Sequence, residues 1–143
     1  MGYVKIWVHL VWTTKNREPI LTREIRHDIF RHIRENAEKK NIYIDYINGH
    51  LEHVRCLISL GYGQTIDKIL MLLKGESSFW INKNKISCRK FEWQDEYFAV
   101  SVSESAVNRV RDYIKNQEDY HKKKSFNDEY QEFMRKYKFD VLV

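Results

Sequence analysis

The order in which strand-like and helix-like segments follow one another restricts the fold of this chain more than any other feature. Residues 3–13 are rich in β-branched and aromatic side chains, which predicts a first strand. Residues 42–47 and 51–60 have the same character, and the Asn-Gly pair between them has the chemistry of a hairpin turn. A fourth strand is predicted over residues 97–102.

Amphipathic helices are predicted between and after these strands. Thr22 can cap the first helix, whose apolar residues recur at every fourth position. The second helix begins at Ile66 and runs toward Trp80. Ser103 can cap a third helix, and Ser125 begins a last helix that carries an aromatic stripe.

The order β-α-β-β-α-β, followed by two further helices, is that of a ferredoxin-like α+β sandwich. We expect an antiparallel sheet with helices on one face, a second face left free, and extra helices at the C-terminus. A chain of 143 residues suits one compact domain, so residues 1–143 are predicted to form a single domain. This architecture carries many chemistries, and the function therefore has to be argued from particular residues.

The charge balance favours a polyanionic partner. Lys and Arg number 25 against 20 Asp and Glu, which gives a formal charge of +5 and favours nucleic acid. The sequence shows neither a signal peptide nor an apolar run that could span a bilayer. Cys56 and Cys88 form no CxxC motif and suit a reducing compartment. We expect a soluble cytoplasmic protein that has no membrane partner.

Two residues of the third strand have the spacing of metal ligands. His53 and Arg55 alternate with the apolar residues Val54 and Cys56, so they share one face of the strand with their Cβ atoms about 7 Å apart. Two ligands of one cation can have this spacing, but a guanidinium has no lone pair to donate. Without further information, the two residues are read as a hydrogen-bonded surface pair.

The third predicted helix carries a second polar pair. Tyr113 and Gln117 lie one turn apart beside the apolar stripe that faces the sheet. The Tyr113 hydroxyl can therefore reach a metal site on the sheet. Taken alone, the pattern equally fits a boundary tyrosine whose ring is packed and whose hydroxyl meets water.

Five short runs, in this order, resemble single-tyrosine HUH transposases, including the REP-associated members. The most specific are the WTTKNR stretch, the SVS segment and the YIKNQE helix, which occur at the separations expected in that family. The similarity covers nearly the whole chain. The runs are 9–12 with 14–17, 52–54, 73–75, 98–103 and 113–118.

In that family a His-hydrophobe-His motif on the third strand and a Gln one turn after the nucleophilic Tyr bind a divalent metal. The resemblance implies that Tyr113 is the nucleophile and that His53 and Gln117 are ligands of Mg²⁺ or Mn²⁺. The tyrosine would attack single-stranded DNA and leave a 5′-phosphotyrosine and a free 3′-hydroxyl, from which the strand can be rejoined.

Arg55 stands where the family has its second histidine. Because a fixed positive charge there replaces a neutral donor, we expect weak metal binding and the loss or strong reduction of metal-dependent cleavage. The alternative is that the guanidinium grips the scissile phosphate and supplies the charge that the metal would have supplied.

The resemblance also implies a homodimer and, as partner, single-stranded DNA with hairpin ends. Two basic segments would contact the phosphates of the hairpin, although each could also be a solvated surface. The expected contact residues are Lys15, Asn16, Arg17, Lys83, Lys85, Arg89 and Lys90.

Two other functions remain open at this point. A homologue that has lost cleavage would act as a DNA-binding repressor or remnant, and Arg55 is the evidence for it. An RNA-binding domain of the ferredoxin-like type would need exposed aromatic side chains on the central strands, where this chain has His53 and Arg55 instead.

Overall fold

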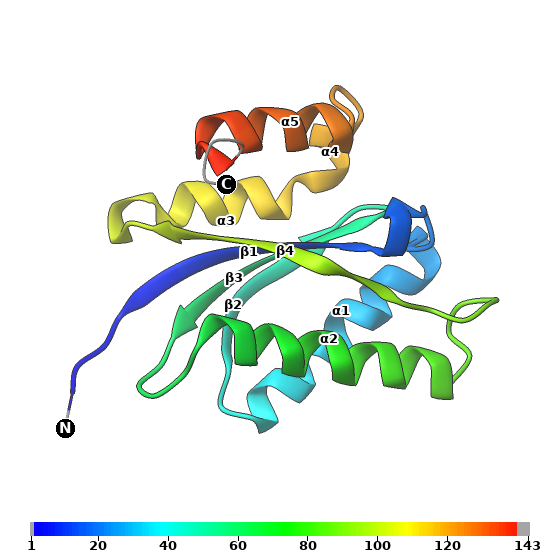
Figure 1. Ribbon diagram of the computed structural model, residues 1–143, viewed down its shortest axis with the longest axis horizontal. Helices are drawn as coiled ribbons and strands as arrows, with labels where there is room; N and C mark the ends of the chain where they lie inside the picture. Colours follow the sequence, from blue (N-terminus) through cyan, green and yellow to red (C-terminus); the bar gives the residue numbers. More distant parts are fainter. Residues whose placement is uncertain (1, 140–143) are drawn as a thin grey trace.

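The computed structural model describes residues 2–139, and its centre is a four-stranded antiparallel sheet in the order β2-β3-β1-β4 (Figure 1). The strands are β1 (Ile6–Thr14), β2 (Tyr43–Gly49), β3 (His53–Leu60) and β4 (Trp93–Val102). The two central strands, β1 and β3, run side by side along their whole length. This order, with one helix between β1 and β2 and another between β3 and β4, confirms the predicted ferredoxin-like α+β class.

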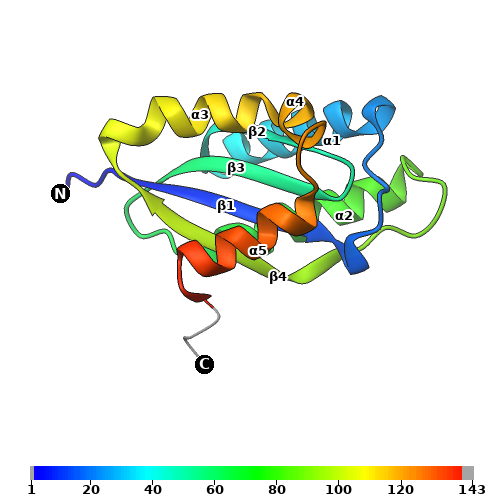
Figure 2. The ribbon, with the colours of Figure 1, turned by 90° about the horizontal axis from the view of Figure 1, so that it is seen from above.

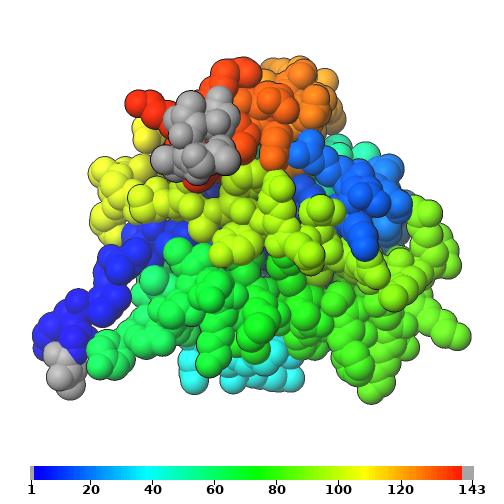
Figure 3. Space-filling model, in the orientation of Figure 1, coloured from blue at the N-terminus to red at the C-terminus, as the bar shows by residue number. Residues whose placement is uncertain are grey.

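Helices cover both faces of the sheet. Figure 1 shows α1 (Arg23–Lys39) and α2 (Ile66–Lys83) below the sheet, and α3 (Val107–Lys115), α4 (Gln117–His121) and α5 (Phe126–Lys136) above it. Seen from above, α5 crosses β1 and β4 while α3 and α4 lie toward β2 (Figure 2). The face that we expected to be free is therefore covered by the C-terminal helices, whose yellow to red atoms lie at the top of the space-filling view (Figure 3).

The two faces of β3 enter different cores, as its alternation predicted. Val54, Cys56 and Ile58 pack with α1 and α2 in the larger core, and each is fully buried. Leu57 points the other way and packs with Val107 and Ile114 of α3. Burying an aliphatic side chain of this size contributes about 1.5–3 kcal/mol, so both faces contribute to stability.

The β2–β3 hairpin turns later than the sequence predicted. Asn48 and Gly49 are the last residues of β2, and the chain reverses over residues 50–52. A Cβ atom on Gly49 would lie 2.1 Å from the carbonyl oxygen of His53, so only glycine allows the two strands to approach so closely here.

The third predicted helix is interrupted. A short 3₁₀ turn, η2 (Glu104–Ala106), precedes α3, and the backbone leaves the helical path at Asn116 before α4 begins. The Asn48 amide donates to the carbonyls of Ile114 and Lys115 at 3.0 and 3.1 Å, which satisfies acceptors that an uninterrupted helix would use itself. This break places Gln117 at the start of α4.

Among residues 2–139, no helix combines the length and the apolar character needed to cross a membrane.

Candidate functional site

The polar residues of β3 lie beneath the C-terminal helices and not at a solvent surface. His53 is completely buried and Arg55 is 2% exposed. His9 of β1 shares this face of the sheet and is buried as well. The reading of His53 and Arg55 as a surface pair is therefore wrong, because α4 and α5 cover both.

Each ring nitrogen of His53 faces a side-chain oxygen. Its Nδ1 lies 2.7 Å from Glu52 Oε1, and its Nε2 lies 2.8 Å from Gln117 Oε1. The Gln117 amide nitrogen donates to the Tyr113 carbonyl at 3.2 Å, and this directs Oε1 toward the histidine. Phe126 stacks on the imidazole with ring centroids 4.2 Å apart. The predicted ligand pair of His53 and Gln117 is thus brought together.

Arg55 forms a buried ion pair that the sequence did not predict. Its guanidinium donates to Glu129 of α5, and its Nη1 lies 3.3 Å from His9 Nε2. Because a guanidinium can only donate, His9 Nε2 accepts and must be unprotonated. Burial, reinforced by the charges of Arg55 and His53, holds the pKa of His9 well below its usual value.

Tyr113 reaches the same carboxylate from the other side. Its hydroxyl donates to Glu129 Oε2, and the Arg55 guanidinium lies 5.1 Å from the centre of its ring.

Ser125 caps the first turn of α5 by accepting a hydrogen bond from the Asp128 amide at 3.2 Å, which confirms the predicted cap. Glu129 lies on the buried side of this helix and is 5% exposed.

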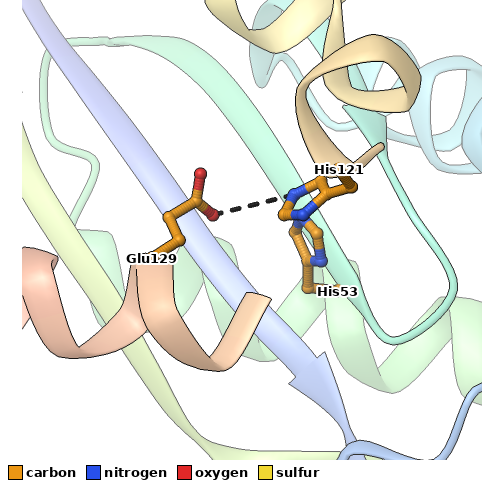
Figure 4. A group of neighbouring side chains, drawn as sticks. All are labelled: His53, His121 and Glu129. Atoms are coloured by element: carbon orange, nitrogen blue, oxygen red, sulfur yellow. Dashed lines mark ion pairs between the residues drawn. The ribbon is translucent and has the colours of Figure 1, made fainter. Parts of the chain in front are cut away.

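His121, at the end of α4, completes the cluster. Its Nδ1 donates to the Lys124 carbonyl at 2.9 Å, and its Nε2 lies 3.3 Å from Gln117 Oε1 and 3.8 Å from Glu129 Oε1. Burial and then the charge of His53 lower the pKa of His121 to about 4, so the ring is neutral at neutral pH. Figure 4 shows the imidazoles of His53 and His121 beside each other, with Glu129 reaching toward them.

A pocket of about 490 Å³ opens beside this cluster, between α3 and α5. Tyr113, Arg55 and Glu129 line its floor, and the basic residues Arg109 and Lys136 line its sides. A phosphodiester that enters the pocket would therefore meet positive charge and the Tyr113 hydroxyl together.

The two basic segments meet at the other end of β1. The 3₁₀ turn η1 (Lys15–Arg17) lies against the chain that precedes β4, because the Lys15 amide donates to the Glu92 carbonyl at 3.0 Å. Acidic side chains pair with several of these cations: Lys15 and Lys90 both contact Glu92. Arg89 pairs with Glu18, and the Arg17 guanidinium lies over the Tyr130 ring at 4.0 Å.

The other expected contact residues have different surroundings. Asn16 takes the left-handed backbone conformation (φ 58°) and its amide donates to the Gln94 side chain. Lys83 ends α2 and Lys85 follows it, and within residues 2–139 neither has an acidic partner within ion-pair distance. A part of the predicted basic surface is therefore neutralised locally, and a part is not.

Sequence reasoning missed three residues of the cluster. The alternation of β1 carries a usable signal for His9, since it buries Val8 and Leu10 in the larger core and turns His9 to the opposite face. The family resemblance carries a signal for His121, because relatives often have two adjacent histidines after the NQE motif, where this chain has Tyr120 and His121. Glu129 has no comparable signal, because it lies on a C-terminal helix whose position over the sheet the pattern did not predict.

Lowering the pH from 7 to 5 should reduce the free energy of unfolding through His9, by at most about 2 kcal/mol. In the unfolded chain the imidazole gains a proton below its ordinary pKa of 6.5, whereas in the folded protein burial keeps the pKa lower and the ring neutral. Stability is thus present above that pKa and is lost as the pH falls. Urea unfolding at both pH values measures the loss, which should shrink in His9→Gln; an unchanged loss would contradict this role.

Comparison with known proteins places this fold in a family. The model of the family "Transposase IS200 like" matches residues 3–117. The ISDra2 transposase TnpA of Deinococcus radiodurans is 25% identical over 124 residues, which cover 82% of this chain and 89% of that protein. The chain therefore belongs to the IS200-like transposase family.

Two solved structures have a similar fold. One, from Deinococcus radiodurans R1, is described as a candidate transposase; it is 25% identical with a TM-score of 0.63, over 82% of this chain and 95% of that chain. The other is a REP-associated tyrosine transposase bound to a REP hairpin, which is 17% identical with a TM-score of 0.63 over 85% of this chain and 72% of that chain. They match the sheet and helix arrangement described above.

Proposed function

We propose that this protein binds hairpin-forming single-stranded DNA and cleaves and rejoins it through a 5′-phosphotyrosine on Tyr113. The observation that carries the proposal is the position of the Tyr113 hydroxyl. It is hydrogen-bonded to the buried Glu129 carboxylate, next to Arg55, on the floor of a pocket with basic sides. Membership of a transposase family makes a strand-transfer reaction the chemistry that best fits this nucleophile.

The reaction uses the Tyr113 oxygen as a nucleophile. As that oxygen bonds to phosphorus, its proton passes to Glu129 Oε2, the atom that already accepts its hydrogen bond. The bond from phosphorus to the 3′ oxygen breaks, and this oxygen takes a proton from water. Arg55 lines the pocket, and its buried Nε has no hydrogen-bond partner within residues 2–139, so the guanidinium has a donor left over beyond its bonds to Glu129 and His9.

The donor atoms at the buried end of the site fit a divalent cation. His53 Nε2 and Gln117 Oε1, which are 2.8 Å apart, would hold Mg²⁺ or Mn²⁺. When bound there, such an ion polarises the scissile phosphate and stabilises charge on its oxygens. An ordinary phenol has a pKa of about 10, so this help matters for a nucleophile that is hardly ionised at neutral pH.

The hairpin would lie on the surface formed by η1 and the segment before β4. Lys83 and Lys85 supply unneutralised charge there, and Lys15, Asn16, Arg17, Arg89 and Lys90 supply donors. The REP-associated relative, which has this fold, is bound to a REP hairpin, and this supports the kind of DNA proposed. A homodimer remains our proposal for the assembly, and the cytoplasm for its location.

The experiment is to incubate the purified chain with single-stranded hairpin DNA in Mg²⁺, in Mn²⁺ and in chelator, and to look for a covalent adduct on a denaturing gel. We expect an adduct of the protein with the 5′ end of the 3′ fragment, and this adduct should depend on added metal. An adduct that also forms in chelator would support Arg55 as the replacement for the metal. The same sequence as a perfect duplex is the control and should give no adduct.

A second candidate function is that of a DNA-binding protein without cleavage, which Arg55 favours. Hairpin binding without any adduct in all three conditions would support this function and contradict the first. The absence of both binding and adduct would contradict both.

A further inference from the structure

We propose that His53, His121 and Glu129 together hold a divalent cation, so that His121 and Glu129 supply the ligands that Arg55 cannot. The three side chains come from β3, α4 and α5, which meet only in the folded protein (Figure 4). The inference deepens the proposed function, since it completes the donor set next to Tyr113, but metal binding can be measured without DNA.

The distances between the donor atoms fit one shared cation. Adjacent ligands of an octahedral ion with bonds of about 2.1 Å lie about 3.0 Å apart, and opposite ligands about 4.2 Å apart. His53 Nε2 lies 2.8 Å from Gln117 Oε1, and His121 Nε2 lies 3.3 Å from that same oxygen. His121 Nε2 lies 3.8 Å from Glu129 Oε1, and one donor atom from each of His53, His121 and Glu129 falls within 4.8 Å of the others. Small side-chain movements would bring all of them to an ion.

Both imidazoles are oriented as ligands. His53 Nδ1 faces the Glu52 carboxylate, and His121 Nδ1 donates to the Lys124 carbonyl. In each ring the Nδ1 proton is thereby fixed on the side away from the cluster, which leaves the Nε2 lone pair directed into it. An acceptor behind the ring is the usual support of a metal-binding histidine, and here two rings have it.

The buried charges also suit a cation. Glu52 and Glu129 are two carboxylates around the cluster, and Arg55 neutralises one of them, so one negative charge is left in excess. A dication would leave one positive charge, which a phosphodiester then balances. Glu129 serves both cations because its Oε1 faces Arg55 and His121 while Oε2 receives the Tyr113 hydroxyl.

The ligand types select the metal. Two imidazole nitrogens favour a transition metal, whereas Mg²⁺ prefers an all-oxygen shell. Mn²⁺ accepts nitrogen and oxygen ligands in six-fold coordination, so we expect this chain to bind Mn²⁺ more tightly than Mg²⁺. The His121 and Glu129 side chains are only 3% and 6% exposed, which restricts competition from water.

The test is Mn²⁺ binding to the DNA-free protein, followed by electron paramagnetic resonance. We expect one Mn²⁺ per chain and couplings to two imidazole nitrogens. In His121→Ala one nitrogen coupling should disappear and the affinity should fall at least about tenfold. The control is His27→Ala, which removes an exposed histidine of α1 and should leave both readings unchanged.

A variant of Glu129 tests the third ligand. Glu129→Gln should lower the Mn²⁺ affinity at least about tenfold, and Asp128→Asn, an exposed carboxylate on the same helix, should not. Because Glu129→Gln also unpairs Arg55, its thermal unfolding is compared with that of the natural chain; if it does not fold, the His121→Ala result decides.

The outcomes separate this inference from the proposed function. If the natural chain shows only one nitrogen coupling and His121→Ala leaves it unchanged, the inference is overturned and His53 and Gln117 remain as the ligand pair, even if the DNA is cleaved. No Mn²⁺ binding at millimolar concentration would overturn it as well. Two-nitrogen binding in a chain that forms no DNA adduct would support the inference while contradicting the proposed function.

Discussion

Replacing Tyr113 by Phe should abolish the covalent DNA adduct and reduce cleavage of hairpin DNA at least about 10³-fold, because the substitution removes the oxygen that would form the phosphotyrosine bond. The fold should persist, since the ring keeps its packing and only the hydrogen bond to Glu129 is lost, at a cost of about 1 kcal/mol. The measurement is adduct formation on a denaturing gel, with thermal unfolding recorded on the same samples.

Tyr120→Phe is the matched control for this result. Tyr120 lines the same pocket, and its ring lies 5.2 Å from that of Tyr113, but within residues 2–139 its hydroxyl makes no hydrogen bond. We expect it to retain the adduct. If the adduct survives in Tyr113→Phe and disappears in Tyr120→Phe, the nucleophile has been assigned to the wrong tyrosine.

Replacing Arg55 by Met should lower the free energy of unfolding by about 3–5 kcal/mol. The substitution leaves the Glu129 carboxylate, which is 5% exposed, without its cationic partner. The double variant Arg55→Met with Glu129→Leu removes both charges, so its loss should be much smaller than that of the single variant. Urea unfolding of the natural chain, the single variants and the double variant measures the coupling between the two residues.

Arg31→Met provides the comparison for an exposed ion pair. Arg31 contacts Asp28 at 3.2 Å with both side chains more than half exposed, and its loss should cost less than about 1 kcal/mol. Equal costs at Arg31 and Arg55 would show that the Arg55 pair contributes no more than a surface contact.

This ion pair changes how an Arg55→His variant has to be interpreted. That exchange would introduce the second histidine that relatives have, but it would also remove the partner of Glu129. The loss of folded protein would then lower the measured cleavage even if the new histidine improved metal binding. The free energy of unfolding therefore has to be measured in the same experiment. The expectation of weak cleavage, drawn from Arg55 alone, stays a prediction.

Much of the fold could be predicted because it depends on local patterns. The period-two alternation around Val54 correctly separated a core face from a polar face, and the four-residue spacing from Ile25 to Ala37 located α1. The hairpin turn was misplaced because an Asn-Gly pair favours turns in isolation, whereas here Gly49 is needed where two strands approach closely. Local preference was overridden by a tertiary contact.

Only the site residues on β3, on α3 and at the start of α4 could be predicted from the sequence. His53, Tyr113 and Gln117 were found from spacing and resemblance, and the structure places all three around one cluster. Glu129 and His121 were missed because their roles depend on how α4 and α5 fold back over the second face. No periodicity in the sequence encodes that path; the Asn48 amide and the buried Phe126 fix it.

The break in the helix after Tyr113 determines which chain supplies the residues of the site. Because the chain bends at Asn116, Tyr113, Gln117, His121 and Glu129 all return to the strands of their own chain. In this arrangement Tyr113, the Glu129 carboxylate and the imidazoles of the cluster belong to one polypeptide. Diluting the protein until any paired copies separate should therefore leave this cluster intact in each chain.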